Sequence, residues 1–284
     1  MKIQKSFKQD KASLYLVATP IGNLSDMSPR AIEVLKSVDI IAAEDTRHTK
    51  KLCHYFEIET ALTSYHEHNK DSKGNYILQL LMQGKEVALV SDAGLPCISD
   101  PGYEIVSQVS DEGYAVIPIP GANAALSALI ASGIVPQPFI FYGFLNRDKK
   151  KKKKELTDLR YQGFTLIFYE SPHRISDTLN AMLEIFGDRR IAIARELTKQ
   201  YEEFIRGQVS EIIPIASDLR GELVIIVEGS KDSPEEVIWW EHLEMEQHVE
   251  HYVAQGLTTN ESIKKVAKER GVAKNEVYRA YHID

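Results

Sequence analysis

Residues 87–102 read VALVSDAGLPCISDPG, and this stretch decides the fold that we predict for the chain. The apolar run at 87–90 lies between charged and polar neighbours, which is the pattern of a short buried strand. The glycines and prolines after it end both helices and sheets, so a loop follows. Asp92, Ser99 and Asp100 lie in that loop, at the end of a strand where open α/β sheets bind ligands. The alternative is an ordinary connection in which Ser99 and Asp100 only cap the next helix.

Strand-like and helix-like segments alternate on both sides of this loop. Further strands are predicted at 14–18, 38–43, 61–65 and 115–119. Helices are predicted to begin at Ser28-Pro29 and to cover about 46–55, 73–83, 103–112 and 124–132. This alternation is typical of βαβ units and predicts a largely parallel sheet in an α/β fold.

Residues 133–138 read as a linker between two domains. Beyond it, strands are predicted at 139–144, 164–169, 191–194 and 223–227, with an antiparallel partner at 204–209. Ser171 and Pro172 predict a helix start, and that helix continues to about residue 186. We therefore expect α/β domains over 1–133 and 138–230, and a helical extension over 234–284. In the extension we predict an acidic helix at 234–255 and a helix–turn–helix-like pair at 260–270 and 274–281.

Composition narrows the class of protein. The 284 residues are 43% hydrophobic and 26% charged, as in a soluble globular chain of more than one domain. No apolar run approaches the roughly 20 residues that span a bilayer, and the N-terminus lacks the apolar segment of a secretory signal. Cys53 and Cys97 are the only cysteines and have no metal-ligand spacing, so we expect a cytoplasmic protein without disulfides or a metal site. The absence of GxGxxG, Walker A, HExxH and GxSxG motifs argues against NAD, ATP, zinc protease and hydrolase functions.

Charged side chains gather at two places. Glu44, Asp45, Arg47 and His48 follow the predicted strand at 38–43, which favours a site that orients a substrate, although Asp45 and Arg47 could also form an ordinary surface ion pair. Six lysines at 149–154 could bind phosphate groups or form a solvated face. Because the net charge is −7, nucleic acid would have to bind to such local basic segments.

Seven segments, in this order along the chain, resemble the ribosomal RNA small subunit methyltransferase I family. They are VATPIGNLSD (17–26), AAEDTR (42–47), SDAGLPCISDPG (91–102), PIPGANAAL (118–126), ESPHR (170–174), ARELTK (194–199) and GELVIIVEG (221–229). Members of this family 2′-O-methylate a cytidine ribose in the decoding region of 16S rRNA. The resemblance spans residues 14–229, and the tail is similar to the family's helical extension. Leu95, Cys97 and Asn123 stand where we expect threonine, another residue type and serine, changes that would alter cofactor contacts slightly.

The resemblance implies the tetrapyrrole methylase fold, in which two α/β domains hold S-adenosylmethionine in the cleft between them. It also implies a homodimer that joins two basic surfaces into one RNA-binding face. Pro20 and its turn would border the substrate entrance, and Lys149, Lys150 and Lys151 are candidates for RNA contact. The cofactor-binding residues that it implies are Asp92, Ala93, Gly94, Ser99, Asp100, Asn123, Ala124, Tyr169, Ala194, Glu196, Gly221, Glu222 and Leu223.

Methyl transfer to a ribose requires a proton acceptor. The 2′-hydroxyl is a poor nucleophile, so a carboxylate or a neutral lysine beside it could take its proton. Asp45 and Lys199 are our candidates because both follow predicted strands, and Arg47 would position a phosphate or a partner carboxylate.

Two other functions remain open at this point. The same fold serves methyltransferases that act on corrin or siroheme precursors, but such small substrates have no use for the lysine run or the tail. A non-catalytic nucleic-acid-binding protein built around the terminal helices would not bind S-adenosylmethionine. Without the resemblance, the residues indicate only a two-domain α/β enzyme with a nucleotide-like ligand.

Overall fold

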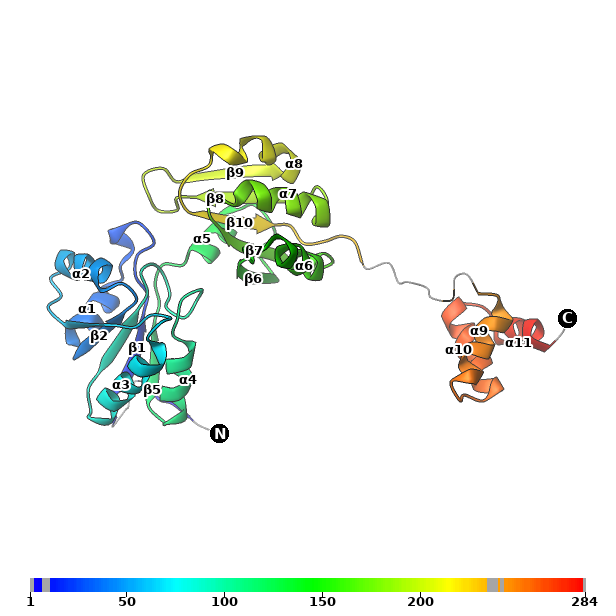
Figure 1. Ribbon diagram of the computed structural model, residues 1–284, viewed down its shortest axis with the longest axis horizontal. Coiled ribbons are helices and arrows are strands. Elements are labelled where there is room, and N and C mark those ends of the chain that lie inside the picture. Colours follow the sequence, from blue (N-terminus) through cyan, green and yellow to red (C-terminus); the bar gives the residue numbers. More distant parts are fainter. Residues whose placement is uncertain (1–2, 7–10, 234–239, 241–242, 283–284) are drawn as a thin grey trace. The chain divides into compact units, whose positions relative to one another are not determined.

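The computed structural model describes residues 3–6, 11–233, 240 and 243–282. The contacts within the chain divide it into two compact units, Met1–Asp232 and Ser233–Asp284. The first unit holds two five-stranded sheets, and the second is made of helices (Figure 1).

The first sheet is parallel throughout, as predicted. Its spatial order is β3-β2-β4-β1-β5, so the strand at 87–90 is central. The strands are β1 (Ser13–Val17), β2 (Ile40–Ala43), β3 (Ala61–Ser64), β4 (Val87–Val90) and β5 (Ala115–Ile119). β4 is buried along its whole length, as its uninterrupted apolar run predicts for a strand covered on both faces.

Helices cover both faces of this sheet. α1 (Pro29–Ser37) and α2 (Thr46–Tyr55) pack on one face, and α3 (Lys70–Met82) and α4 (Tyr103–Asp111) pack on the other. The predicted start of α1 is confirmed, because the Ser28 side chain accepts a hydrogen bond from the Ala31 N–H and Pro29 stands at the first helical position. A short 3-10 helix (Leu24–Asp26) precedes it.

The second sheet is mixed, with the order β6-β7-β10-β8-β9. β6 and β7 are parallel and the other neighbours are antiparallel, including the predicted antiparallel pair β8 and β9. The strands are β6 (Phe139–Phe144), β7 (Thr165–Glu170), β8 (Arg190–Arg195), β9 (Glu203–Gln208) and β10 (Leu223–Val227). One face is covered by α6 (Lys149–Leu159), α7 (Ile175–Phe186), α8 (Val209–Ile212) and the 3-10 helix Ile213–Asp218.

The opposite face of the second sheet is covered by α5 (Ala124–Ala131), which directly follows β5 of the first sheet (Figure 1). Ala125, Ala128 and Leu129 pack on residues of β7, β8 and β10. The small side chains of Ala125 and Ala128 let the helix lie close to the sheet. α5 thus already packs on the second sheet before the linker that we predicted at 133–138. The domain boundary at that linker stays a prediction.

One helix prediction is wrong in detail. The helix predicted to begin at Pro172 begins at Ile175, because residues 171–174 form a turn in which the Ser171 carbonyl accepts the N–H groups of Arg174 and Ile175. The lysine run is not simply a solvated face, since it forms the first turns of α6 and Lys152 is buried.

The C-terminal unit contains α9 (Met245–Ala254), α10 (Thr259–Arg270) and α11 (Lys274–His282) around its own apolar core. The predicted helix pair is confirmed, and Gly271 separates its members in the left-handed conformation. The acidic helix begins only at Met245, because Glu244 caps it in a capping box with Gln247. Residues 234–239 and 241–242, which we also predicted to be helical, lie outside the described residues. Among the described helices, none is long and apolar enough to cross a membrane.

Candidate functional site

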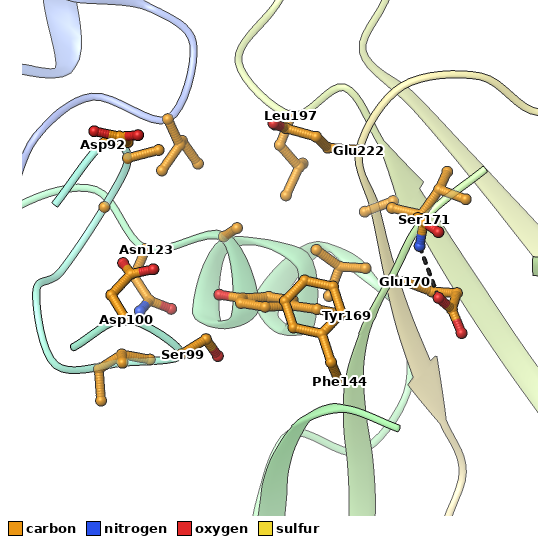
Figure 2. Close-up of a pocket in the computed structure, with 18 of the residues that line it drawn as sticks. Asp92, Ser99, Asp100, Asn123, Phe144, Tyr169, Glu170, Ser171, Leu197 and Glu222 are labelled. Carbon is orange, nitrogen blue, oxygen red and sulfur yellow. Dashed lines mark hydrogen bonds between the residues drawn. The ribbon is translucent and has the colours of Figure 1, made fainter. Parts of the chain in front are cut away.

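A cavity of about 420 Å³ lies in the first unit and takes its walls from both sheets. From the first sheet come the residues after β2 and β4 and the start of α5. From the second come the ends of β6, β7 and β8 and the start of β10. Figure 2 shows the polar groups Asp92, Asp100 and Asn123 on one side, and Tyr169, Glu170 and Glu222 on the other.

The wall from the first sheet is acidic. Glu44, Asp92 and Asp100 all line the cavity, and Asp92 Oδ1 accepts a hydrogen bond of 3.1 Å from the Asp45 N–H. Burial, together with the neighbouring charges of Glu44 and Asp92, raises the pKa of Asp100 to about 6. Burial and the charge of Asp92 also raise the pKa of Glu44. Three carboxyl groups crowded in this way favour a ligand that brings positive charge.

The loops around the cavity have unusual backbone conformations. Five non-glycine residues of the described chain have positive φ, and four of them, Cys97, Ser99, Glu196 and Thr198, lie in the two loops beside the cavity. Such conformations cost free energy, and they persist where the surrounding structure enforces them, often at ligand sites. The 91–102 loop is also tied to the first strand, because Gly94 and Thr19 exchange two backbone hydrogen bonds of 2.9 and 3.0 Å.

The wall from the second sheet is largely apolar. The rings of Phe144 and Tyr169 meet edge-on with their centroids 5.5 Å apart, and Leu197 and Val224 lie on the same wall. Aromatic and aliphatic side chains of this kind bind the flat, apolar parts of small ligands.

An ion-pair cluster forms one edge of the site. Lys199 Nζ lies 2.9 Å from both Glu196 Oε1 and Glu222 Oε2. Glu196 Oε1 also accepts the Glu222 N–H at 2.9 Å, and a Cβ on Gly221 would collide with that carboxylate, so glycine is required there. Burial lowers the pKa of Lys199, but the two carboxylates outweigh it and the net shift is upward. The ammonium form is therefore stabilised, which disfavours the predicted role of a neutral lysine as proton acceptor.

A buried network lies behind the wall formed by β7. Glu170 accepts a hydrogen bond of 2.6 Å from the Thr178 hydroxyl, which in turn accepts one of 2.8 Å from Lys152 Nζ. Arg174 Nε lies 3.4 Å from the other carboxylate oxygen, which also accepts the Ser171 N–H. Lys152 thus stabilises a wall of the cavity and is not exposed for RNA binding.

The cavity brings together twelve of the thirteen residues that we predicted to bind a cofactor. The exception is Glu196, which does not line the cavity but contacts the Glu222 N–H and Lys199 Nζ. Asp45, Arg47, Lys199, Pro20, Lys149, Lys150 and Lys151 do not line the cavity. Arg47 Nη2 forms an ion pair with Asp45 Oδ2 at 2.7 Å, and Lys149 Nζ forms one with Asp177 Oδ2 at 3.2 Å. Ile21, the residue after Pro20, does line the cavity.

Sequence reasoning did not assign a ligand-binding role to several lining residues. Glu170, Ser171 and Pro172 were recognised only as a motif and a helix start, although their place after β7 is itself a signal of a site. Phe144 and Leu197 carry no polar signal, and only the fold brings them to the cavity.

We predict that Asp100→Asn stabilises the protein in a pH-dependent way. With a pKa raised from 3.8 to about 6, the native carboxyl keeps its proton while that of the unfolded chain loses it. The stability that this proton contributes is present below about pH 4 and is lost as the pH rises through about 6. Asn removes this loss, so the melting temperature should exceed the wild-type value clearly at about pH 8 and less at about pH 4.5.

Asp188→Asn is the matched control. Its carboxylate accepts two hydrogen bonds from Ser210, which lower its pKa, so this substitution should lower the melting temperature at about pH 8. An equal gain for Asp100→Asn at both pH values would show that Asp100 is not under charge repulsion.

Comparison with known proteins identifies the family. The sequence profile described as Tetrapyrrole (Corrin/Porphyrin) Methylases matches residues 13–213. The chain is similar to Ribosomal RNA small subunit methyltransferase I of Bacillus subtilis (strain 168), with 63% identity over 100% of this chain and 99% of that protein. It is also similar to the protein of that name from Halalkalibacterium halodurans, with 56% identity over 99% of each chain.

Solved structures share the fold at low identity. Uroporphyrin-III C-methyl transferase from Thermus thermophilus, solved as a complex with S-adenyl homocysteine, matches with a TM-score of 0.56 and 16% identity, over 76% of this chain and 97% of that one. The two sheets of this chain together correspond to one fold of this type. The relatives named above match the chain over 99–100% of its length. The chain therefore belongs to the ribosomal RNA small subunit methyltransferase I family, within the tetrapyrrole methylases.

Proposed function

We propose that this chain transfers a methyl group from S-adenosylmethionine to the 2′-hydroxyl of a cytidine in the decoding region of 16S rRNA. The observation that carries the proposal is the cavity, whose acidic wall comes from the segments that resemble the family and whose apolar wall includes Leu197 and Val224 of those segments. The full-length relatives are named as small-subunit rRNA methyltransferases.

The cavity fits the proposed cofactor by size and by chemistry. About 420 Å³ lies within the usual range of small-molecule sites. S-adenosylmethionine carries a sulfonium and an ammonium group, which suit the carboxylates of Asp92 and Asp100, and an adenine ring, which suits the apolar wall at Tyr169 and Leu197. When bound, it supplies the methyl group that leaves its sulfur as the ribose oxygen loses a proton.

The protein's own contribution is to hold, orient and exclude water. The backbone at Gly94 is fixed by Thr19, and Asn123 caps α5 by accepting the Leu126 N–H at 2.9 Å. Gly94 and Asn123 both line the cavity, so backbone groups of fixed position lie beside the ligand. Methyl transfer needs alignment of the attacking oxygen with the sulfur–carbon bond, and such positioning can supply a large part of the rate.

We assign proton acceptance to Glu44 in preference to the predicted Asp45. The bidentate pair with Arg47 lowers the pKa of Asp45 and makes it a weak base, and Asp45 does not line the cavity. Glu44 lines the cavity, and burial together with the charge of Asp92 raises its pKa, which makes it a stronger base than Asp45. Asp45 then serves to hold Arg47, and Lys199 serves as a positive charge that fixes Glu222 at the edge of the cavity.

A homodimer in the cytoplasm is also part of the proposal. The reduced cysteines and the ribosomal substrate agree with that compartment. The dimer follows from resemblance to the family.

Methyl transfer to ribosomal RNA tests the proposal directly. Purified protein, labelled S-adenosylmethionine and small ribosomal subunits from cells lacking this enzyme should yield label at one ribose 2′-oxygen of 16S rRNA. Protein that binds the cofactor but labels neither subunits nor naked rRNA would contradict the proposal. Labelling of a tetrapyrrole precursor in its place would favour the alternative within the same fold.

We predict that Glu44→Gln lowers kcat at least a hundredfold, because loss of a general base costs about that much. Because Glu44 is also one of the three carboxylates that favour a cationic ligand, kcat is compared at saturating S-adenosylmethionine, with the dissociation constant of the cofactor measured separately. Asp45→Asn is the neighbouring control and should lose less than tenfold in kcat. A larger loss for Asp45→Asn than for Glu44→Gln would return the role to Asp45.

Replacing Lys149, Lys150 and Lys151 together by Gln should weaken binding to 16S rRNA and flatten its dependence on salt. These side chains are exposed at the start of α6, so the fold should tolerate the change. Binding measured at several salt concentrations decides the matter. Unchanged binding would leave the exposed lysines as a solvated face.

A further inference from the structure

A second hollow, of about 760 Å³, lies beside α2 and shares no lining residue with the first cavity. Thr46, Arg47, Lys50, Cys53 and His54 of α2 form one side. Ile58, Glu59 and Thr60 lie at its end, and Leu62, Thr63 and Ser64 of β3 form the other side. We call this hollow, with these residues, the α2–β3 groove.

The groove is basic although the chain is acidic. Arg47, Lys50 and His54 recur at helical spacing and therefore lie on one side of α2, which contains no Asp or Glu. Glu59 is the only acid among the lining residues. Arg47 has 88% of its side chain exposed and Lys50 is exposed, so both can reach a ligand in solvent.

The opposite side of the groove carries the Ser64 hydroxyl. Ser64 lies on the same face of β3 as Leu62, which packs in the core beneath α1 and α2, whereas the Thr63 hydroxyl points to the other face, where Lys73 of α3 donates a hydrogen bond of 3.0 Å to it. Cations facing hydroxyl groups are the combination with which proteins bind the phosphates and sugars of nucleic acid.

The groove lies directly beside the cofactor cavity. Glu44 lines the cavity, while Thr46 and Arg47, two and three residues further along the chain, line the groove. A strand whose target ribose enters the cavity can therefore place its neighbouring nucleotides along α2.

We infer that the α2–β3 groove binds the sugar–phosphate backbone of the RNA strand next to the methylated nucleotide, an inference that rests on the proposed function. Arg47 and Lys50 contact phosphates there, and Ser64 faces the sugars. Arg47 exchanges its pair with Asp45, which is exposed to solvent and therefore weak, for a phosphate.

The test compares two adjacent lysines in the full-length protein. Lys50 lines the groove, whereas Lys51 is also exposed but does not line it. Lys50→Ala should weaken binding to a naked 16S rRNA transcript about fivefold and reduce the slope of log K against log salt by roughly 0.7 to 1. Lys51→Ala should change the affinity less than twofold. Both variants should keep the wild-type affinity for S-adenosylmethionine.

The outcomes separate this inference from the proposed function. Equal effects of Lys50→Ala and Lys51→Ala would overturn the groove while leaving methyl transfer intact. Loss of cofactor affinity in Lys50→Ala would also overturn it, since the change would then act through the fold. A wild-type protein that binds RNA through Lys50 but transfers no methyl group would sustain the groove and contradict the proposed function.

Discussion

The packing of α5 on the second sheet is the contact on which the rest of the molecule depends. The helix leaves the first sheet at β5, and its alanines let it lie close against β7 and β10. Its first residues, Asn123 and Ala124, stay at the cavity. A bulky residue at Ala125 or Ala128 would push the helix away from the sheet, and overpacking of this kind costs about 1–3 kcal/mol. A single short helix that continues from the first sheet and packs on the second thus lets two sheets with different strand directions share one ligand site.

The electrostatics of the site follow from this arrangement. Burial and repulsion between neighbouring carboxylates raise the pKa values of Asp100 and Glu44. In the ligand-free protein these groups are therefore poorly solvated when they are charged. A cationic ligand relieves that repulsion. Across the cavity, the opposite arrangement holds at Lys199, where two carboxylates surround one ammonium. The carboxylates of Asp100 and Glu44 can thus interact with a charged ligand on one side of the cavity. On the other side, the charge of Lys199 is neutralised by the protein's own carboxylates.

Most of the fold could be predicted from the sequence, because apolar runs and turn residues mark each strand of both sheets within one or two residues. The mixed direction of the second sheet could not be predicted in full, since strand direction depends on how the connections cross the sheet and not on local pattern. The burial of one lysine in the run at 149–154 could not be predicted for a related reason. Lys152 is chemically like its neighbours, and only the approach of Thr178 on α7 explains its burial.

The candidate site was predictable to the extent that its residues follow strand ends. Asp92, Ser99 and Asp100 carry polar side chains after a buried strand, and the structure brings them to the cavity. The resemblance supplied Tyr169 and Ala194, which no local rule identifies. Phe144 and Leu197 were missed because an apolar side chain gives the same signal in a core and in a ligand site. Asp45 was chosen over Glu44 because two adjacent acids cannot be distinguished before their burial and partners are known.

A cavity that is completed by α5 has a consequence for quality control in the cell. Neither sheet alone forms the whole site. A nascent chain therefore cannot bind the ligand there until its second sheet has formed and packed against α5. A small molecule that binds there stabilises only the fully folded protein, and so lowers the unfolded fraction that proteases can degrade. The abundance of the protein would then follow the supply of its own ligand.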